Sequence, residues 1–278
     1  MRRTINIVLV ICASALACLA VFETPLPEAQ ATAMGDFNPL IGTGPGSIFG
    51  EYGITGGAGY RRSFNYSDFD EACGWSSYGR EKLGRFMVNV ASYGPGDLTS
   101  ETKISVGYSR PVVDDIHTKL SFGAVGNLNS LSYGKSVGGI DLGSGAAGSF
   151  DIAAEAIIYD RTKVRLLAEN ITSTNMGVEG DVELPRAVTG LIGYSPYNNT
   201  EMMFYVRREA SLDYNYGLGI SVAPHEMIVL RLGAATNPDR VTGGIGLKYK
   251  MVHFDYALKS NPVLPMSHTI SLGVEIGN

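Results

Sequence analysis

The side chains in this chain that could do chemistry are ionisable residues placed two positions apart. His253 and Asp255 have this spacing, so in a β-strand they would lie on one face, close enough for an acid–base pair. Catalysis would also need a nucleophile beside them, and no serine motif has the strand–turn–helix context that a nucleophile requires. We therefore favour a structural charge pair over a catalytic one, and we expect no catalytic residues, no metal and no cofactor.

Other charged residues recur on the same face of alternating segments whose opposite face is bulky and apolar. If the apolar face meets lipid, each Arg or Lys placed there near the membrane midplane would cost about 2–4 kcal/mol, so the charges belong on the inner face. Their signs are mixed, which leaves open ion pairs that fill the interior or a polar path; we favour pairing because a barrel of this size has little spare interior. The candidate lumen residues are Asp151, Glu155, Lys163, Arg165, Glu169, Arg207, Arg231, Lys248, His253, Asp255 and Glu275.

The elements that would position these residues have a period of two, which is typical of β-strands. In Val241–Tyr249, for example, Ile245 and Leu247 lie on one face and Gly246 and Lys248 on the other. A bulky apolar face opposite a small or charged face is what a closed membrane barrel needs. A soluble β-sandwich also alternates, but its solvent face would carry more Lys, Glu and Thr than the Gly, Ser and Ala seen here. The sandwich is kept as the alternative.

About twelve such segments follow residue 85, each near the ~9–11 residues that a tilted membrane strand needs. A less periodic pair, Ile48–Tyr60 and Phe64–Tyr78, would bring the number to about fourteen, and single-chain bacterial barrels generally have even strand numbers. We therefore predict an all-β fold, a transmembrane antiparallel up-and-down β-barrel of about 12–14 strands. The twelve expected strands are Arg85–Tyr93, Thr102–Ser109, Thr118–Gly126, Ser149–Tyr159, Thr162–Asn170, Arg186–Tyr194, Thr200–Arg208, Asp213–Val222, Glu226–Ala235, Val241–Tyr249, Met251–Lys259 and His268–Ile276.

The N-terminal residues have the layout of a secretory signal peptide. Two arginines precede an apolar stretch over Ile5–Val21, and Ala29-Gln30-Ala31 and Ala31-Thr32-Ala33 both match the A-x-A cleavage pattern. Ala15-Leu16-Ala17-Cys18 is a minor alternative that resembles a lipoprotein cleavage site. The expected divisions are a cleaved signal peptide over 1–33, a Gly- and Tyr-rich segment over 34–84 that is a plug or a first strand pair, and an outer-membrane β-barrel over 85–278.

The cysteine count and the charge balance exclude several classes of protein. Cys12 and Cys18 fall in the predicted leader, so Cys73 alone remains, and neither a disulfide framework nor a cysteine metal site is expected. The formal net charge is −5 and no basic block interrupts the sequence, which argues against nucleic acid as a partner.

Several short motifs follow one another near the C-terminus: Leu230-Arg231-Leu232-Gly233, Phe254-Asp255-Tyr256-Ala257 and Ser267-His268-Thr269-Ile270-Ser271-Leu272-Gly273. In this order they resemble the end of the PorV/PorQ family of FadL-like outer-membrane barrels. The resemblance spans residues 149–276, although the Asn-Pro-Ala that usually follows the family's Gly-Gly-Ala segment is absent here. The positions that match the family pattern are Asp255, Tyr256, Ala257, His268, Ser271 and Leu272.

This resemblance implies a non-enzymatic barrel of the bacterial outer membrane. FadL-like members are channels or carriers for hydrophobic or small molecules, whereas PorV-like members serve type IX secretion, and the sequence leaves both roles open. The implied partners are outer-membrane lipid, the machinery that inserts barrels, and either a hydrophobic ligand or components of a secretion system. The alternative is a secreted soluble β-sandwich or barrel that binds a ligand.

Overall fold

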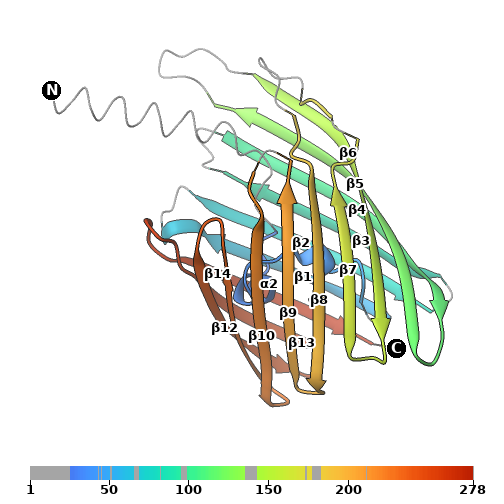
Figure 1. Ribbon diagram of the computed structural model, residues 1–278. Helices are drawn as coiled ribbons and strands as arrows, with labels where there is room; N and C mark the ends of the chain where they lie inside the picture. Colours follow the sequence, from blue (N-terminus) through green and yellow to red (C-terminus); the bar gives the residue numbers. More distant parts are fainter. Residues whose placement is uncertain are drawn as a thin grey trace.

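The computed structural model shows a closed barrel of fourteen antiparallel strands (Figure 1). Each strand pairs with its neighbours in sequence, and β1 closes the barrel by pairing with β14. This topology confirms the predicted up-and-down barrel and shows that the sandwich alternative is wrong about the fold. The structure describes residues 26–42, 44, 46–50, 52–65, 69–81, 83–94, 99–134, 143–172, 174–176, 183–210 and 212–277.

Residues 1–25, which make up most of the predicted signal peptide, lie outside the described residues. The strands are β1 (Gly53–Arg62), β2 (Asp70–Arg80), β3 (Gly84–Tyr93), β4 (Thr99–Asp114), β5 (Thr118–Tyr133), β6 (Ser144–Ile158), β7 (Thr162–Glu169), β8 (Ala187–Tyr197), β9 (Thr200–Glu209), β10 (Asn215–His225), β11 (Ile228–Ala235), β12 (Arg240–Tyr249), β13 (Val252–Lys259) and β14 (Ser267–Ile276).

The observed elements refine the expected ones in two places. The segment expected over 34–84 as a plug or a first strand pair holds both, because the chain up to Gly50 precedes the barrel and β1 and β2 are its first two strands. Strands β4 and β5 are 16 residues long and β6 is 15, so the long connection expected after residue 126 is largely strand. The alternation of Leu128 facing out and Leu131 facing in continues past the expected end of β5, which is why the strand extends.

The two ends of the barrel differ. At one end β2–β3, β6–β7, β8–β9, β10–β11 and β12–β13 are joined by two or three residues, and β1 begins and β14 ends there; we call it the short-turn end. The opposite, long-loop end carries the connections β5–β6 and β7–β8. Outer-membrane barrels show this asymmetry, with short turns on the periplasmic side and longer loops outside.

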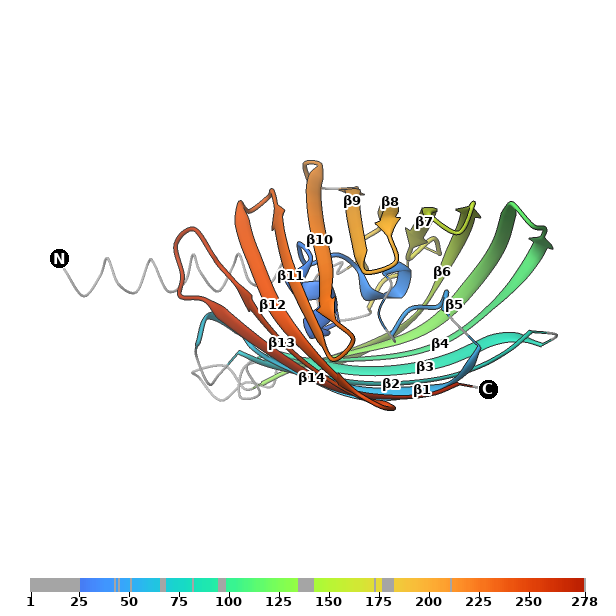
Figure 2. The ribbon, with the colours of Figure 1, turned by 90° about the horizontal axis from the view of Figure 1, so that it is seen from below.

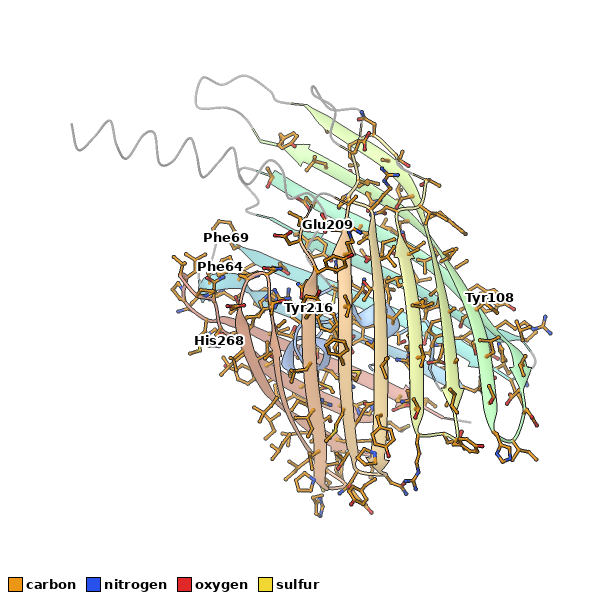
Figure 3. The ribbon with its side chains drawn as sticks, in the orientation of Figure 1. Phe64, Phe69, Tyr108, Glu209, Tyr216 and His268 are labelled. Atoms are coloured by element: carbon orange, nitrogen blue, oxygen red, sulfur yellow. The ribbon has the colours of Figure 1, made fainter. Side chains whose placement is uncertain are left out.

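The outer face of the barrel is covered by large apolar side chains (Figure 3). Leu218 on β10 and Leu232 on β11 are 57% and 63% exposed there. Aromatic rings lie toward both ends. The ring centroids of Phe86 and Tyr108 are 4.7 Å apart near the short-turn end, and those of Phe64 and Phe69 are 6.3 Å apart near the long-loop end. An exposed apolar surface of this extent suits a lipid environment, with aromatic side chains at its two boundaries.

The described residues that precede β1, from Leu26 onward, lie inside the barrel (Figure 2). We call the described residues between Leu26 and Gly50 the plug. It holds the short helix α2 (Ala29–Ala33) and the 3-10 turn η1 (Pro39–Ile41), while a second 3-10 turn, η2 (Ser63–Asn65), follows β1. A five-residue helix is too short to be stable alone, so contacts with the wall must maintain α2. In the described part of the chain, no helix has the length and apolar character needed to cross a membrane.

Candidate functional site: a plugged lumen

The centre of the lumen is an apolar core shared by the plug and the barrel wall. The plug side chains Met34, Phe37 and Ile41 are at most 2% exposed. They belong to one cluster with inward-facing residues of β3 and β5–β9. These wall residues are Met87, Val125, Ala153, Leu167, Leu191, Met203 and Tyr205.

This apolar row on the wall was missed by the sequence analysis, which expected a lumen lined by small and charged residues. The signal was present where alternation gives way to a continuous apolar run, as in Leu166–Ala168 and Met202–Val206. A strand that is apolar on both faces contacts lipid outside and another apolar surface inside. The runs fall at mid-strand, opposite the plug, so they mark the height at which the plug docks.

Glycines on the wall allow the plug backbone to approach the strands closely. A Cβ atom at Gly219 would lie 2.3 Å from the carbonyl oxygen of Met34, and one at Gly233 would lie 2.3 Å from the amide nitrogen of Gly35. A Cβ at Gly59 would meet the carbonyl oxygen of Pro27 at 2.1 Å. At these positions only glycine leaves room for the plug, which explains part of the small-residue face of the strands.

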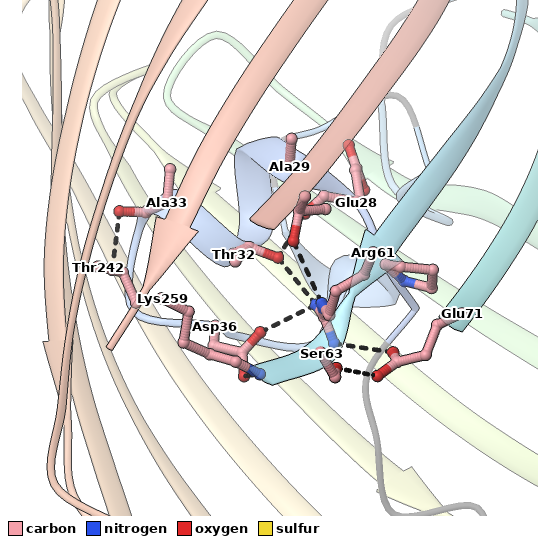
Figure 4. A network of polar contacts seen from close by, with 12 residues as sticks. Glu28, Ala29, Thr32, Ala33, Asp36, Arg61, Ser63, Glu71, Thr242 and Lys259 are labelled. Atoms are coloured by element: carbon pink, nitrogen blue, oxygen red, sulfur yellow. Dashed lines mark hydrogen bonds and ion pairs between the residues drawn. The ribbon is translucent and has the colours of Figure 1, made fainter. Parts of the chain in front are cut away.

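A buried arginine connects the plug to three strands (Figure 4). Arg61 on β1 is fully buried and donates hydrogen bonds to Thr32 at 2.8 Å and Asp36 at 3.2 Å in the plug. The same guanidinium donates to Glu71 on β2 at 3.1 Å and to Thr269 on β14 at 3.2 Å. A buried charge with several charge-assisted hydrogen bonds fixes the relative positions of the groups around it.

Asp36 also faces two further cations, on strands β12 and β13, which lie near β1 on the other side of β14. Lys259 on β13 donates to its Oδ2 at 3.1 Å, and Arg240 on β12 lies 3.8 Å from the same oxygen. Burial alone would raise the pKa of the Asp36 carboxyl group, but Lys259, Arg61 and Arg240 outweigh it and hold that pKa below its usual value. Asp36 therefore remains ionised in the docked plug and connects the plug to β1, β12 and β13.

Most of the charges expected to line the lumen are paired with a residue one or two strands away. The carboxylate of Glu155 accepts a hydrogen bond from Arg165 at 2.6 Å, and Arg165 also donates to the plug carbonyl of Ile41 at 2.9 Å. Asp151 accepts from Asn127 at 2.8 Å. The ion pairs are Glu155 with Arg165, Glu169 with Arg207, Lys163 with Glu201, Arg231 with Asp255, and Lys248 with Glu275, and the His253 side chain also contacts Glu275.

His253 and Asp255 do not pair with each other. His253 Nε2 lies 3.1 Å from Glu275, whereas Asp255 accepts a hydrogen bond from Arg231 at 2.6 Å. Among the described residues, no three His, Cys, Asp or Glu side chains gather closely enough to hold a metal ion. The arrangement is that of structural charge pairs between strands one or two positions apart.

The positions matched to the family motif hold strands and plug together. Ser271 accepts a hydrogen bond from the backbone N–H of Ala29 at 3.3 Å, and Ala257 packs against Ala29 and Ala33 of α2. Tyr256 and His268 share a hydrogen bond of 2.7 Å between β13 and β14. Leu272 lies on the outer face, 53% exposed.

A cavity of about 630 Å³ lies between the plug and the short-turn end. Plug residues Glu28 and Phe49 close one side of it, and the wall lines the rest with charged, polar and apolar side chains, Trp75 and Ile157 among the last. The charged residues include Arg85, Lys119, Lys163, Arg231, Lys248, Asp255 and Glu275. The lumen therefore holds a cavity of mixed polarity at this end and is filled at its apolar centre by the plug.

Glu28 stands at the boundary between the plug and this cavity. Its side chain is buried against Gly44 and Gly46 of the plug and beside the Arg231–Asp255 pair. Burial raises the pKa of Glu28 to about 8, Asp255 adds to the rise, and Arg231 and the backbone of Gly46 oppose it. At neutral pH the carboxyl group is therefore mainly protonated while the plug is docked.

We expect plug docking to weaken as the pH rises from about 4.5 to about 8. In this pH range Glu28 keeps its proton in the docked plug but would release it if exposed, so docking takes up a proton. The equilibrium constant for docking therefore falls by up to about tenfold for each pH unit. Opening frequency in planar bilayers at pH 6 and pH 8 measures the effect. The Glu28→Gln side chain stays neutral, so the part of the pH dependence that comes from Glu28 should vanish in this variant. The same change of opening frequency with pH in both proteins would show that Glu28 does not control docking.

No protein-family model and no curated protein matches this sequence. Among solved structures, the fold is similar to the CymD monoaromatic hydrocarbon channel, with a TM-score of 0.63, 11% identity, and coverage of 93% of this chain and 100% of that chain. For the toluene transporter TbuX of Ralstonia pickettii the TM-score is 0.64, with 12% identity over 92% of this chain and 100% of that one. For a FadL homologue of Pseudomonas aeruginosa the TM-score is 0.53 and the identity 10%, with coverage of 91% of this chain and 97% of that chain. At these identities the similarity establishes the fold alone, a closed β-barrel.

Proposed function

We propose that this protein is a non-enzymatic channel of the bacterial outer membrane that carries small hydrophobic molecules. The observation that carries the proposal is the apolar row on β3 and β5–β9 beneath the plug. A channel for ions or sugars would not need an apolar row in its lumen. An apolar solute that binds to the row is stabilised by about 25 cal/mol for each Å² of its surface removed from water. Movement of the plug would uncover this row inside a lipid-facing barrel.

The comparisons support the same proposal. CymD and TbuX are described as a monoaromatic hydrocarbon channel and a toluene transporter, and both share this chain's barrel over nearly its full length. The apolar outer face and the asymmetric ends fit insertion in the outer membrane, with the short-turn end in the periplasm.

Uptake of radiolabelled toluene by cells that express the protein tests this function, with glucose as the hydrophilic control. We expect toluene uptake to rise several-fold and glucose uptake to stay unchanged. Leu167→Gln places an amide in the apolar row and should reduce the gain, whereas Leu166→Phe, at the adjacent outward position, should leave it intact. Equal stimulation of both solutes, or of neither, would contradict a hydrophobic channel.

The C-terminal motif, which resembles that of the PorV/PorQ family, raises a second candidate, a PorV-like barrel that serves protein secretion. Ser271 and Ala257, two of the matching positions, contact α2. A plug contact is compatible with either role, so the motif does not choose between them. Deleting the gene in its host separates the two: loss of secreted proteins with unchanged toluene uptake would support the secretion role and reject the channel.

A further inference from the structure

The sequence pattern that resembles a signal-peptidase site is buried in the lumen. Ala29, Thr32 and Ala33 are at most 1% exposed, and each is bonded to or packed against the barrel wall. The Ala29 N–H donates to Ser271 at 3.3 Å, Thr32 accepts from Arg61 at 2.8 Å, and the Ala33 carbonyl accepts from Thr242 at 2.9 Å. These contacts connect the segment to β14, β1 and β12.

Close packing explains the small residues of this segment. A Cβ atom at Gly244 would lie 2.7 Å from the Cβ of Ala33, and Ala29 and Ala33 pack directly on Ala257. Helix α2 therefore lies almost on the strand backbone, where larger side chains would overpack the lumen. The spacing of alanines that matches A-x-A is thus required by the barrel interior.

Cleavage within this segment would place a new charge in the lumen. Hydrolysis after Ala31 would put an ammonium group on Thr32, which is 0% exposed and lies beside the guanidinium of Arg61. Hydrolysis after Ala33 would put it on Met34, which is also 0% exposed and packed against the backbone of β10 and β11. A buried charge without a compensating partner is unfavourable, and a like charge beside it makes it more so.

We propose that the mature protein keeps residues Ala29–Ala33 as part of its plug and begins upstream of Leu26. Two A-x-A sequences meet this requirement, Ala13-Ser14-Ala15 and Ala15-Leu16-Ala17, and we assign cleavage to the second because Cys18 follows it, as in a lipoprotein cleavage site. Ten residues, Ile5–Ser14, precede this cleavage sequence, which is inside the usual range of about 7–15 for the apolar region, whereas Ile5–Val21 exceeds that range. Hydrolysis of the Ala17–Cys18 bond consumes one water and leaves a carboxylate on Ala17 and an ammonium group on Cys18.

The intact mass of the protein purified from outer membranes tests the proposal directly. We expect a chain that begins at Cys18; a lipid on Cys18 would add its own mass and support the same cleavage position. A chain that begins at Thr32 or Met34 would overturn the proposal. A chain that still begins at Met1 would show that the Ala17–Cys18 bond is not cleaved and would also overturn the proposal.

Two substitutions test the site through processing alone, so the result does not depend on folding. Ala31→Leu alters both downstream A-x-A sequences and should leave removal of the leader at its normal rate. Ala17→Leu should make the uncleaved precursor accumulate. The reverse pattern, with accumulation in Ala31→Leu only, would show that the buried segment is the cleavage site.

Discussion

Replacing Arg61 with methionine is expected to free the plug and open the lumen. The change removes the shared partner of Thr32, Asp36, Glu71 and Thr269 and leaves the Glu71 carboxylate buried beside an apolar side chain. Removing one member of a buried ion pair typically costs about 3–5 kcal/mol, which is a hundredfold or more in the docking equilibrium. Single-channel recordings should show long-lived open states that are rare in the unmodified protein.

The next residue along the strand supplies a matched control. Arg62 also pairs with an acid on β2, but its ion pair with Asp70 lies on the surface, with the two side chains 45% and 35% exposed. An exposed pair contributes about 0–1 kcal/mol, so Arg62→Met should behave like the unmodified protein. A gel shift on boiling will confirm that both variants form the barrel. Equal conductance of the two variants would show that the Arg61 cluster does not hold the plug.

Substituting leucine for Gly219 is expected to displace the plug by steric exclusion. The first side-chain atom would already lie 2.3 Å from the Met34 carbonyl oxygen, so the backbone on either side of Met34 must leave its site. Met34 is fully buried, and its removal also exposes the apolar row on the wall. Hydrogen exchange should therefore accelerate by orders of magnitude in the plug while the strands stay protected.

Gly126 on the outer face of β5 is the corresponding control. No atom lies within 4 Å of a Cβ built there, so Gly126→Leu adds an apolar side chain to the lipid-facing surface without a clash. We expect unchanged exchange in the plug of this variant. Full protection of the plug in Gly219→Leu would refute the docked arrangement.

The barrel itself could be predicted because its signal is local. In Val241–Tyr249 the period of two shows which side chains share a face, and the cost of charge in lipid shows which face is inside. The paired charges Glu155 and Arg165 are likewise inward on adjacent strands of a short hairpin, where alternation is sufficient to place them.

The plug could not be located in this way because its contacts depend on residues far apart in the chain. Ala29 and Ser271, which are bonded in the lumen, are 242 positions apart, and Arg61 lies 208 positions from Thr269. The sequence by itself determined a strand-rich chain with one apolar and one small or charged face. Only the closed barrel decided that Gly59, Gly219 and Gly233 make room for a buried segment, because steric fit between two surfaces exists only after both have folded.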